Sequence, residues 1–224
     1  MEVNIFNFSI DCVAGVDYGL RCPAVVVIKP NACEEVFVPF SDCEFYYLTN
    51  TKSHALNCKN LHGTLLTDWD SAPNRFESIA QWALKVLTDN KVRTVGLEGY
   101  AFGAKGNSLI DLAENCGMLK WFLHTHSIPY DIHAPTEIKK FATTNGKSDK
   151  DAMYSYFMEY TGIDLNGAFG RDPEAKSKSP VSDLVDAYFI ACLQRVESAI
   201  TNADYGVTEL LPNPKKEEKK NESL

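Results

Sequence analysis

The sequence predicts an α/β domain built on a mixed five-stranded sheet with helices on both faces. Three β-rich runs with short turns between them come first, and amphipathic helices then alternate with two further strands. The chain has 224 residues, 45% of them hydrophobic, which is ample material for one sizeable core. We expect a single domain over residues 1–211, with an irregular insertion at about 41–72, a mobile loop at about 164–179 and a disordered charged tail at 212–224.

The expected strands follow from short β-branched runs bounded by turn residues. "CVAGVDY", "PAVVVIK" and "EEVFVPF" predict an antiparallel meander over 12–18, 23–29 and 34–40, whose first strand should be central in the sheet. "KVRTVGLE" predicts a fourth strand at about 91–98, and "PYDIHAP" predicts a short fifth strand.

The expected helices follow from apolar residues spaced three and four apart. One begins after Ser71 or Ala72, a second covers "NSLIDLAENCGMLKWFLHTHS", and a third starts at Thr136. Two more cover about 149–161 and about 180–200, the last with Pro180 in its opening turn. This order of strands and helices resembles that of a ribonuclease-H-like domain.

Charge, cysteine content and the length of the apolar runs limit what the protein can bind and where it can act. The net charge is −8, and it is −9 without the last ten residues, so a nucleic-acid role must depend on local basic segments and bound cations. Seven cysteines without a CxxC pair, and no signal pattern, indicate an intracellular, reducing compartment, with a viral or organellar origin left open. Apolar runs are too short to cross a bilayer, so we expect no membrane partner.

Four acidic residues fall where the sheet and the last helix could bring them together: Asp17, Glu98, Asp183 and Asp186. The spacing of Asp183 and Asp186 puts both on one side of their helix, and Ala187 suggests that this side faces the sheet. Converging carboxylates repel one another unless cations compensate them. Oxygen ligands suit Mg²⁺ or Mn²⁺, and two such ions about 4 Å apart can activate water and stabilise a leaving phosphodiester oxygen.

Each of these acids also has a commoner structural explanation. Asp17 could be a turn residue, Glu98 a surface acid at a strand end, and the pair in "SDLVD" could complement a helix dipole. Their joint occurrence in this order favours a metal site.

Four segments carry a family resemblance. "GVDYG", "LEGYAFG…NS", "IKKF…NGKSDKDAM" and "SDLVDAYFIA" resemble, in order and spacing, the RuvC family of Holliday-junction resolvases, from about residue 12 to residue 193. A lone "GVDYG" would be weak, because actin-like ATPases and sugar kinases also begin with such a strand and turn. The chain resembles a divergent member, because it has the insertion and lacks a large positive face.

The resemblance implies metal ligation by Asp17, Glu98, Asp183 and Asp186. It matches Lys139 and Lys150 to two family lysines near the cleaved strand and makes Lys150 a catalytic candidate. It also implies a homodimer whose two active sites nick opposite strands of a four-way DNA junction.

A basic segment and an aromatic loop supply the DNA-binding candidates. Lys139, Lys140, Lys147 and Lys150 against Asp149 give a local charge of +3, which could contact phosphates or form a solvated helix face. In the loop after Glu98, Tyr100 or Phe102 could stack on an unpaired base, or could cap the core. Lys105 and Asn107 are weaker candidates for phosphate contact.

Other polar and aromatic residues have less specific patterns. His54, Cys58 and His62 have helical spacing, but a structural zinc site would need a fourth ligand. We expect His124, His126 and His133 at strand edges or on the surface, where one could assist a nucleophilic water. The tryptophans are expected in the core: Trp69, Trp82 and Trp121.

The predicted function is that of a metal-dependent, structure-selective DNA endonuclease that resolves four-way junctions. One alternative is another ribonuclease-H-fold nuclease that acts on RNA–DNA hybrids or on branched or flap DNA. A second alternative is a protein that binds branched DNA without cutting it, although clustered acids beside phosphate would bring such a protein no benefit.

Overall fold

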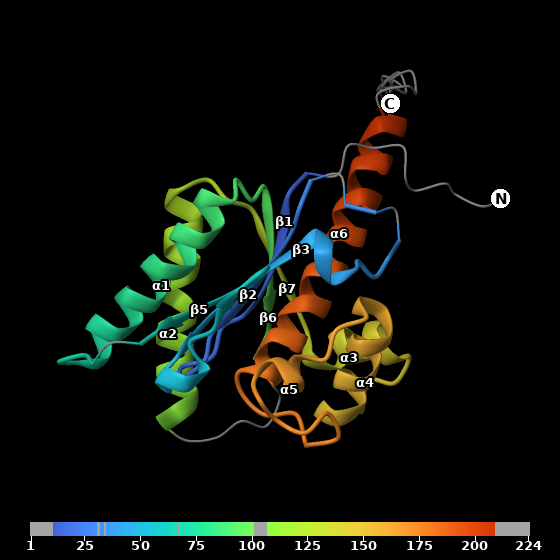
Figure 1. Ribbon diagram of the computed structural model, residues 1–224. Helices are drawn as coiled ribbons and strands as arrows, with labels where there is room; N and C mark the ends of the chain where they lie inside the picture. The colour runs from blue at the N-terminus through green and yellow to red at the C-terminus, as the bar shows by residue number, and fades with distance from the viewer. Residues whose placement is uncertain (1–10, 31, 34, 67, 101–106, 209–224) are drawn as a thin grey trace, which may run out of the picture.

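The computed structural model describes residues 11–30, 32–33, 35–66, 68–100 and 107–208, with the side chains of 107, 108 and 201–208 left aside. A single mixed sheet divides the molecule into layers (Figure 1). Helices α1 (Ala72–Asp89) and α2 (Asn107–Thr125) cover one face, and the long helix α6 (Val181–Thr208) crosses the other. The α/β architecture with helices on both faces is confirmed.

The sheet has seven strands in the order β4-β5-β3-β2-β1-β6-β7, where five were expected. β1 (Val13–Asp17) lies inside the sheet, where it pairs antiparallel with β2 (Ala24–Ile28) and parallel with β6 (Thr94–Glu98). The outer strands are β3 (Cys43–Thr49), β4 (Asn57–Cys58), β5 (Leu61–Leu65) and the edge strand β7 (Tyr130–His133). The predicted central position of the first strand is confirmed.

Side-chain caps are found at the starts of α1 and α4 (Lys150–Thr161). The Ser71 hydroxyl accepts a hydrogen bond from Asn74 N at the start of α1, and the Asp149 carboxylate accepts one from Ala152 N at the start of α4. Helix α3 (Pro135–Thr143) opens with a proline, and α5 (Leu165–Ala168) is a single turn. Residues 40–42 and 52–54 form 3₁₀ turns.

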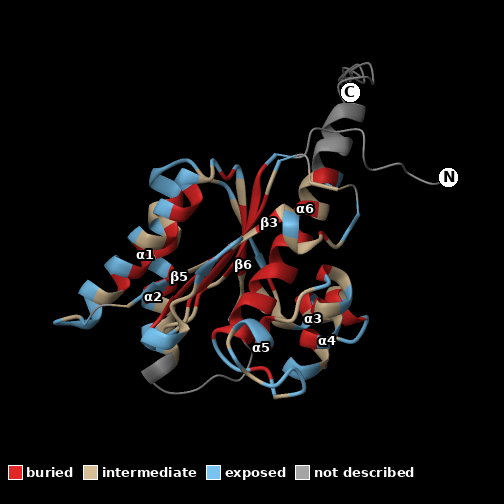
Figure 2. Cartoon of the chain, viewed as in Figure 1, coloured by how far each residue is buried: buried red, intermediate tan, exposed pale blue. Residues whose placement is uncertain are grey.

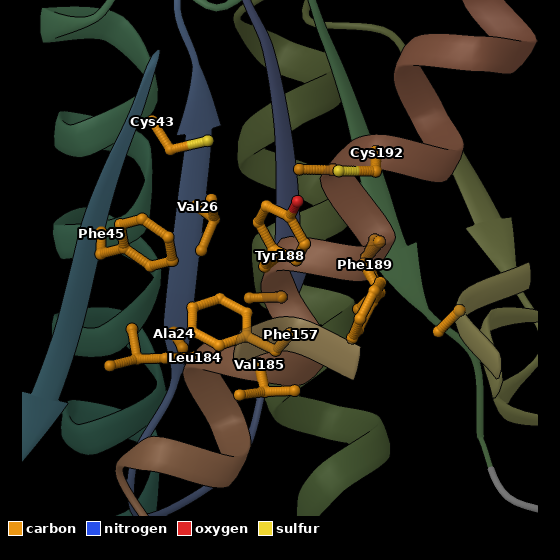
Figure 3. Packing of buried hydrophobic residues seen from close by; sticks show 14 of the residues in the cluster. Ala24, Val26, Cys43, Phe45, Phe157, Leu184, Val185, Tyr188, Phe189 and Cys192 are labelled. Atoms are coloured by element: carbon orange, nitrogen blue, oxygen red, sulfur yellow. The ribbon is translucent and has the colours of Figure 1, made fainter. Parts of the chain in front are cut away.

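Buried residues lie along the sheet and on the helices that cover it (Figure 2), and their apolar side chains form two core clusters. On the α6 side, Phe45 of β3 packs near Phe157 of α4 and Tyr188 of α6 (Figure 3). On the other side, Ile79 and Leu87 of α1 belong to a second core with β1 and β2. Both faces of β1 are therefore buried, which explains its uninterrupted apolar sequence.

The predicted strand at 34–40 is wrong, and the third antiparallel strand lies at 43–49 instead. Side chains of α6 bind the backbone of the earlier segment. The Arg195 guanidinium donates to the carbonyl oxygens of Cys33 and Glu35, and the Tyr188 hydroxyl donates to Val38 O at 2.9 Å. These carbonyl groups find their partners on α6, so no sheet ladder is needed to satisfy them.

Residues 41–72, expected to be irregular, contain three strands. β3 pairs parallel with β5, and β4 adds a short antiparallel hairpin at the edge. His54, Cys58 and His62 lie in a 3₁₀ turn and two different strands, so the helical spacing does not hold. His62 Nε2 lies 2.7 Å from Glu44 Oε2.

The segment expected to be a mobile loop, 164–179, contains α5 and several long-range hydrogen bonds. Asn166 Nδ2 donates to Ala175 O, and Ser177 N donates to Asp151 Oδ1. The tail at 212–224 lies outside the described residues. Among the helices that the structure describes, none combines the length and apolar character that a membrane span requires. All seven cysteines are free.

Candidate active site

Asp17 and Glu98 end two neighbouring parallel strands. The register pairs Val16 of β1 with Leu97 of β6, so the next residue on each strand brings the two carboxyl groups to the same edge. The two groups lie close enough for the charge of Glu98 to help raise the pKa of Asp17. Two carboxyl groups that repel each other at a sheet edge form a site that a cation could stabilise.

Helix α6 adds two more acids because it packs unusually close to β1. A methyl group at Gly15 would overlap the backbone of α6 at Ala187 and Ala191. The glycine and the two alanines therefore let the helix backbone touch the strand. This contact brings Asp183 and Asp186, in the first turns of α6, next to the ends of β1 and β6.

The four acids line one hollow of about 410 Å³, together with two of the predicted lysines. Lys139 comes from α3 and Lys150 from the first turn of α4. Lys150 Nζ lies 4.0 Å from Asp183 Oδ1. The other residues that line the hollow are Gly99, Tyr100, Leu112, Pro135, Ile138 and Met153.

Burial raises the pKa values of all four carboxyl groups, and mutual repulsion adds to the shift for three of them. Burial is the largest cause for Asp17, whose pKa is well above its ordinary value, and the charges of Glu98, Asp183 and Asp186 add to it. The pKa of Asp186 is raised to about 7 by burial and then by Glu98, while Lys150 opposes the shift. Burial also raises the pKa values of Glu98 and Asp183. Without a cation, the folded cluster therefore holds protons that exposed carboxyl groups would have lost at the same pH.

One carboxylate oxygen in the cluster lacks a partner. Asp183 Oδ2 is buried without a hydrogen bond to any described residue, whereas Oδ1 accepts one from the Ser182 hydroxyl at 3.2 Å. A buried, unpaired carboxylate oxygen costs free energy unless a ligand satisfies it. A set of carboxylate donors with such an oxygen fits a hard divalent cation.

The other DNA-binding candidates divide into three groups. Tyr100 is 40% exposed, lines the hollow and has Lys120 Nζ 5.3 Å from its ring centre. Lys140 and Lys147 are exposed and lie outside the walls of the hollow. Phe102 and Lys105 lie outside the described residues, and Asn107 is the first residue of α2, with its side chain also left aside.

A second hollow, of about 610 Å³, adjoins the first and shares Asp17 and Asp183 with it. Arg21, from the turn after β1, and Arg75, from the first turns of α1, both line it. Sequence reasoning missed both arginines. Arg75 lies in the first turns of a helix and Arg21 in a turn, and a single arginine at either place has no distinctive sequence pattern. Only their position beside the acidic cluster distinguishes them from ordinary surface charges.

His133 lies on the edge strand β7, as expected, but it is only 2% exposed because α6 covers its ring. The expectation that Trp121 lies in the core is wrong. Trp121 is 59% exposed, because it lies on the face of α2 that points away from the sheet, whereas Trp69 and Trp82 pack against the core. An apolar helical stripe predicts which face is buried only where that stripe is clear, and Trp121 is outside it.

No protein-family model matches the chain, and no curated protein sequence matches it. Several solved structures are similar to it. A structure of Thermus thermophilus RuvC has a TM-score of 0.56 at 15% identity, covering 85% of this chain and 97% of that chain. A structure of T. thermophilus RuvC in complex with Holliday junction substrate has a TM-score of 0.58 at 15% identity, covering 85% and 96%.

A third is the yeast mitochondrial Holliday junction resolvase, with a TM-score of 0.52 at 11% identity, covering 91% of this chain and 86% of that chain. These similarities show that the protein has a ribonuclease-H-like fold. Within that class, its architecture is similar to that of the T. thermophilus RuvC structures.

Proposed function

We propose that the protein is a metal-dependent, structure-selective DNA endonuclease that resolves four-way junctions by paired symmetric nicks. The observation that carries the proposal is the convergence of Asp17, Glu98, Asp183 and Asp186 with Lys150 in one hollow. The fold supports it, because structures with this architecture include RuvC with a Holliday junction substrate. Neither the acids nor the fold alone would specify this chemistry.

The four carboxylates would hold Mg²⁺ or Mn²⁺, with two ions per active site. Bound cations would supply a more acidic water as nucleophile and would offset the charge on the leaving oxygen. Asp17 and Glu98, fixed on adjacent strands, would form the rigid half of the site. Asp183 and Asp186 on α6 would complete it.

The basic and aromatic residues around the acids would position the DNA. Lys150, within 4.0 Å of Asp183, could stabilise charge that develops on the scissile phosphate, and Lys139 could contact the same strand. Arg21 and Arg75 in the second hollow could bind phosphates on the other side of the acidic cluster. Exposed Tyr100 could stack on a base that the junction leaves unpaired.

Paired nicks require two active sites, and we propose that a homodimer provides them. Helix α2 exposes Ile110 and Trp121, each 59% accessible. They lie eleven residues apart, about three turns, and so share one face of the helix. This apolar face is suited to pack against the same face of a second copy.

The Asp17→Asn protein provides the central test. The substitution removes a negative charge and a ligand with little change in volume, so the fold and junction binding should survive, with metal-free stability at least equal to that of the parent. Single-turnover cleavage in Mg²⁺ should fall by several orders of magnitude. Thermal melting, junction affinity in Ca²⁺ and cleavage of a labelled four-way junction are the measurements. Near-normal cleavage would contradict both the proposed metal site and the nuclease assignment.

Competition separates the proposal from the two alternatives. An intact four-way junction should outcompete linear duplex, flap DNA and RNA–DNA hybrid for cleavage by the parent protein. Preferred cleavage of the hybrid or flap would assign a different nuclease activity. Tight junction binding without nicks in either Mg²⁺ or Mn²⁺ would identify a binding protein.

A further inference from the structure

A second group of metal-ligating side chains lies outside the candidate active site. Among the described residues, the ligand atoms of His133, Glu137 and Glu197 all lie within 4.8 Å of one another. They come from the end of β7, the first turn of α3 and the middle of α6. The acids of the candidate active site are not grouped so tightly in the described structure.

The hydrogen bonds of His133 determine which ring nitrogen carries its proton. Gln194 Nε2 donates to Asp131 Oδ2 at 2.8 Å, so its amide oxygen faces His133 Nε2 at 2.9 Å. An amide oxygen only accepts, and therefore Nε2 of the imidazole must donate. Nδ1 of the neutral ring is then left with a free electron pair.

A carboxylate lies close to that nitrogen. His133 Nδ1 lies 3.8 Å from Glu197 Oε2, too far for a hydrogen bond, and the His133 side chain is only 3% exposed. A lone pair beside a carboxylate is repelled unless a proton or a cation lies between them. A histidine that donates its other N–H to a carbonyl oxygen is also the usual arrangement at metal sites.

We propose that His133 Nδ1, Glu137 and Glu197 bind one divalent cation, and that Zn²⁺ is the cation whose ligand preference fits. One imidazole nitrogen and two carboxylates are ligands that Zn²⁺ takes at about 2.0–2.2 Å, with water at the fourth position. Side-chain adjustments of about 1 Å would bring the three ligand atoms to that distance. The Glu137 carboxylate, which accepts a hydrogen bond from Ala134 N at 3.3 Å, has a second oxygen for the cation.

The site would join three elements that otherwise meet at the edge of the sheet. Glu137 precedes Lys139 by two residues on α3, and Lys139 lines the candidate active site. A cation here would therefore hold the start of α3 against α6. The inference does not depend on the proposed nuclease activity, because cation binding is measured without DNA.

The test is a zinc titration of the full, metal-stripped chain in millimolar Mg²⁺, by competition with a chromogenic chelator. A Cys58→Ser background removes the exposed thiol, which would bind zinc by itself. We expect one tight equivalent whose X-ray absorption shows nitrogen and oxygen neighbours. Glu197→Gln and Glu137→Gln should each weaken binding more than about tenfold, and neither substitution changes a fully buried residue.

Two control variants separate this site from others. Glu159→Gln, an exposed carboxylate on α4, should leave the zinc affinity unchanged, and so should Asp17→Asn. Sulfur neighbours in the absorption spectrum, or unchanged affinity in both Glu197→Gln and Glu137→Gln, would overturn the proposal. So would loss of zinc binding in Asp17→Asn, which would assign the ion to the candidate active site.

Discussion

The ionisation of Asp186 should be measurable through the pH dependence of the free energy of unfolding. Its pKa is raised to about 7 by burial and by Glu98, so the folded protein holds a proton there that the unfolded chain loses near pH 4. Between these pH values the folded state binds more protons than the unfolded state. The contribution of Asp186 to metal-free stability is therefore present at low pH and is lost as pH rises toward 7.

Asp186→Asn should remove this dependence. In EDTA, the free energy of unfolding of the variant should exceed that of the parent at about pH 7.5, by on the order of 1 to 3 kcal/mol, and the difference should shrink at about pH 5. Denaturant unfolding at both pH values measures it. A difference that is constant with pH would show that Asp186 is not protonated in the folded, metal-free protein.

The four lysines of the basic segment provide a matched comparison. Lys139→Ala and Lys150→Ala should lower single-turnover junction cleavage by about 100-fold, because their charges lie beside the acids where the transition state develops charge. Junction affinity in Ca²⁺ should change much less. Lys140→Ala and Lys147→Ala, outside the hollow, should alter cleavage little. If all four variants lose affinity and rate to the same extent, these lysines contact the DNA phosphates and have no separate role in cleavage.

At the scale of elements, the contact between β1 and α6 holds the candidate active site together. Gly15→Ala would place a methyl group in the backbone of α6, so the helix must shift. We expect a loss of about 1 to 3 kcal/mol in the free energy of unfolding and weaker Mg²⁺ binding, because Asp183 and Asp186 move with the helix.

Gly117→Ala is the control for that substitution. Gly117 lies within α2, and an added methyl group meets no atom within 4 Å. The exchange should stabilise the protein by about 0.5 to 1 kcal/mol, as alanine does in helices. Thermal melting of both variants in the Trp121→Lys background compares a close packing contact with an open one, because Gly117 lies on the α2 face proposed for the dimer. Equal effects would contradict the tight approach of α6 to β1.

The elements also show where local patterns succeed. Ser71 and Asp149 mark the beginnings of α1 and α4, since each cap uses partners within three residues. The segment 34–40 has the composition of a strand, yet its carbonyl groups bind Arg195 and Tyr188, about 150 residues away. Local sequence contains no trace of such a partner. The prediction of a strand there was therefore wrong for a reason that lies outside the segment.

At the scale of the whole molecule, the proposed homodimer is tested by the exposed face of α2. Trp121→Lys should convert a dimer into a monomer, because a charged side chain at the centre of an apolar interface is costly to desolvate. Sedimentation velocity measures the change. Leu65→Lys, at an exposed apolar residue of β5 that is 45% accessible, should leave the assembly unchanged. A parent protein that sediments as a monomer at all concentrations would contradict the proposal.

The sequence by itself determined the long helices, the strands β1, β2, β6 and β7, and the candidate acids, because strand patterns, helix caps and residue spacing act over a few neighbours. Asp17, Glu98, Asp183 and Asp186 could be selected from the order of these elements alone. Only the tertiary structure decided that Lys139 and Lys150 line the hollow while Lys140 and Lys147 do not, and that Arg21 and Arg75 adjoin it. Only the tertiary structure places His133 beside Glu137 and Glu197. These groupings depend on how α3, α4 and α6 pack on the sheet, which no local pattern encodes.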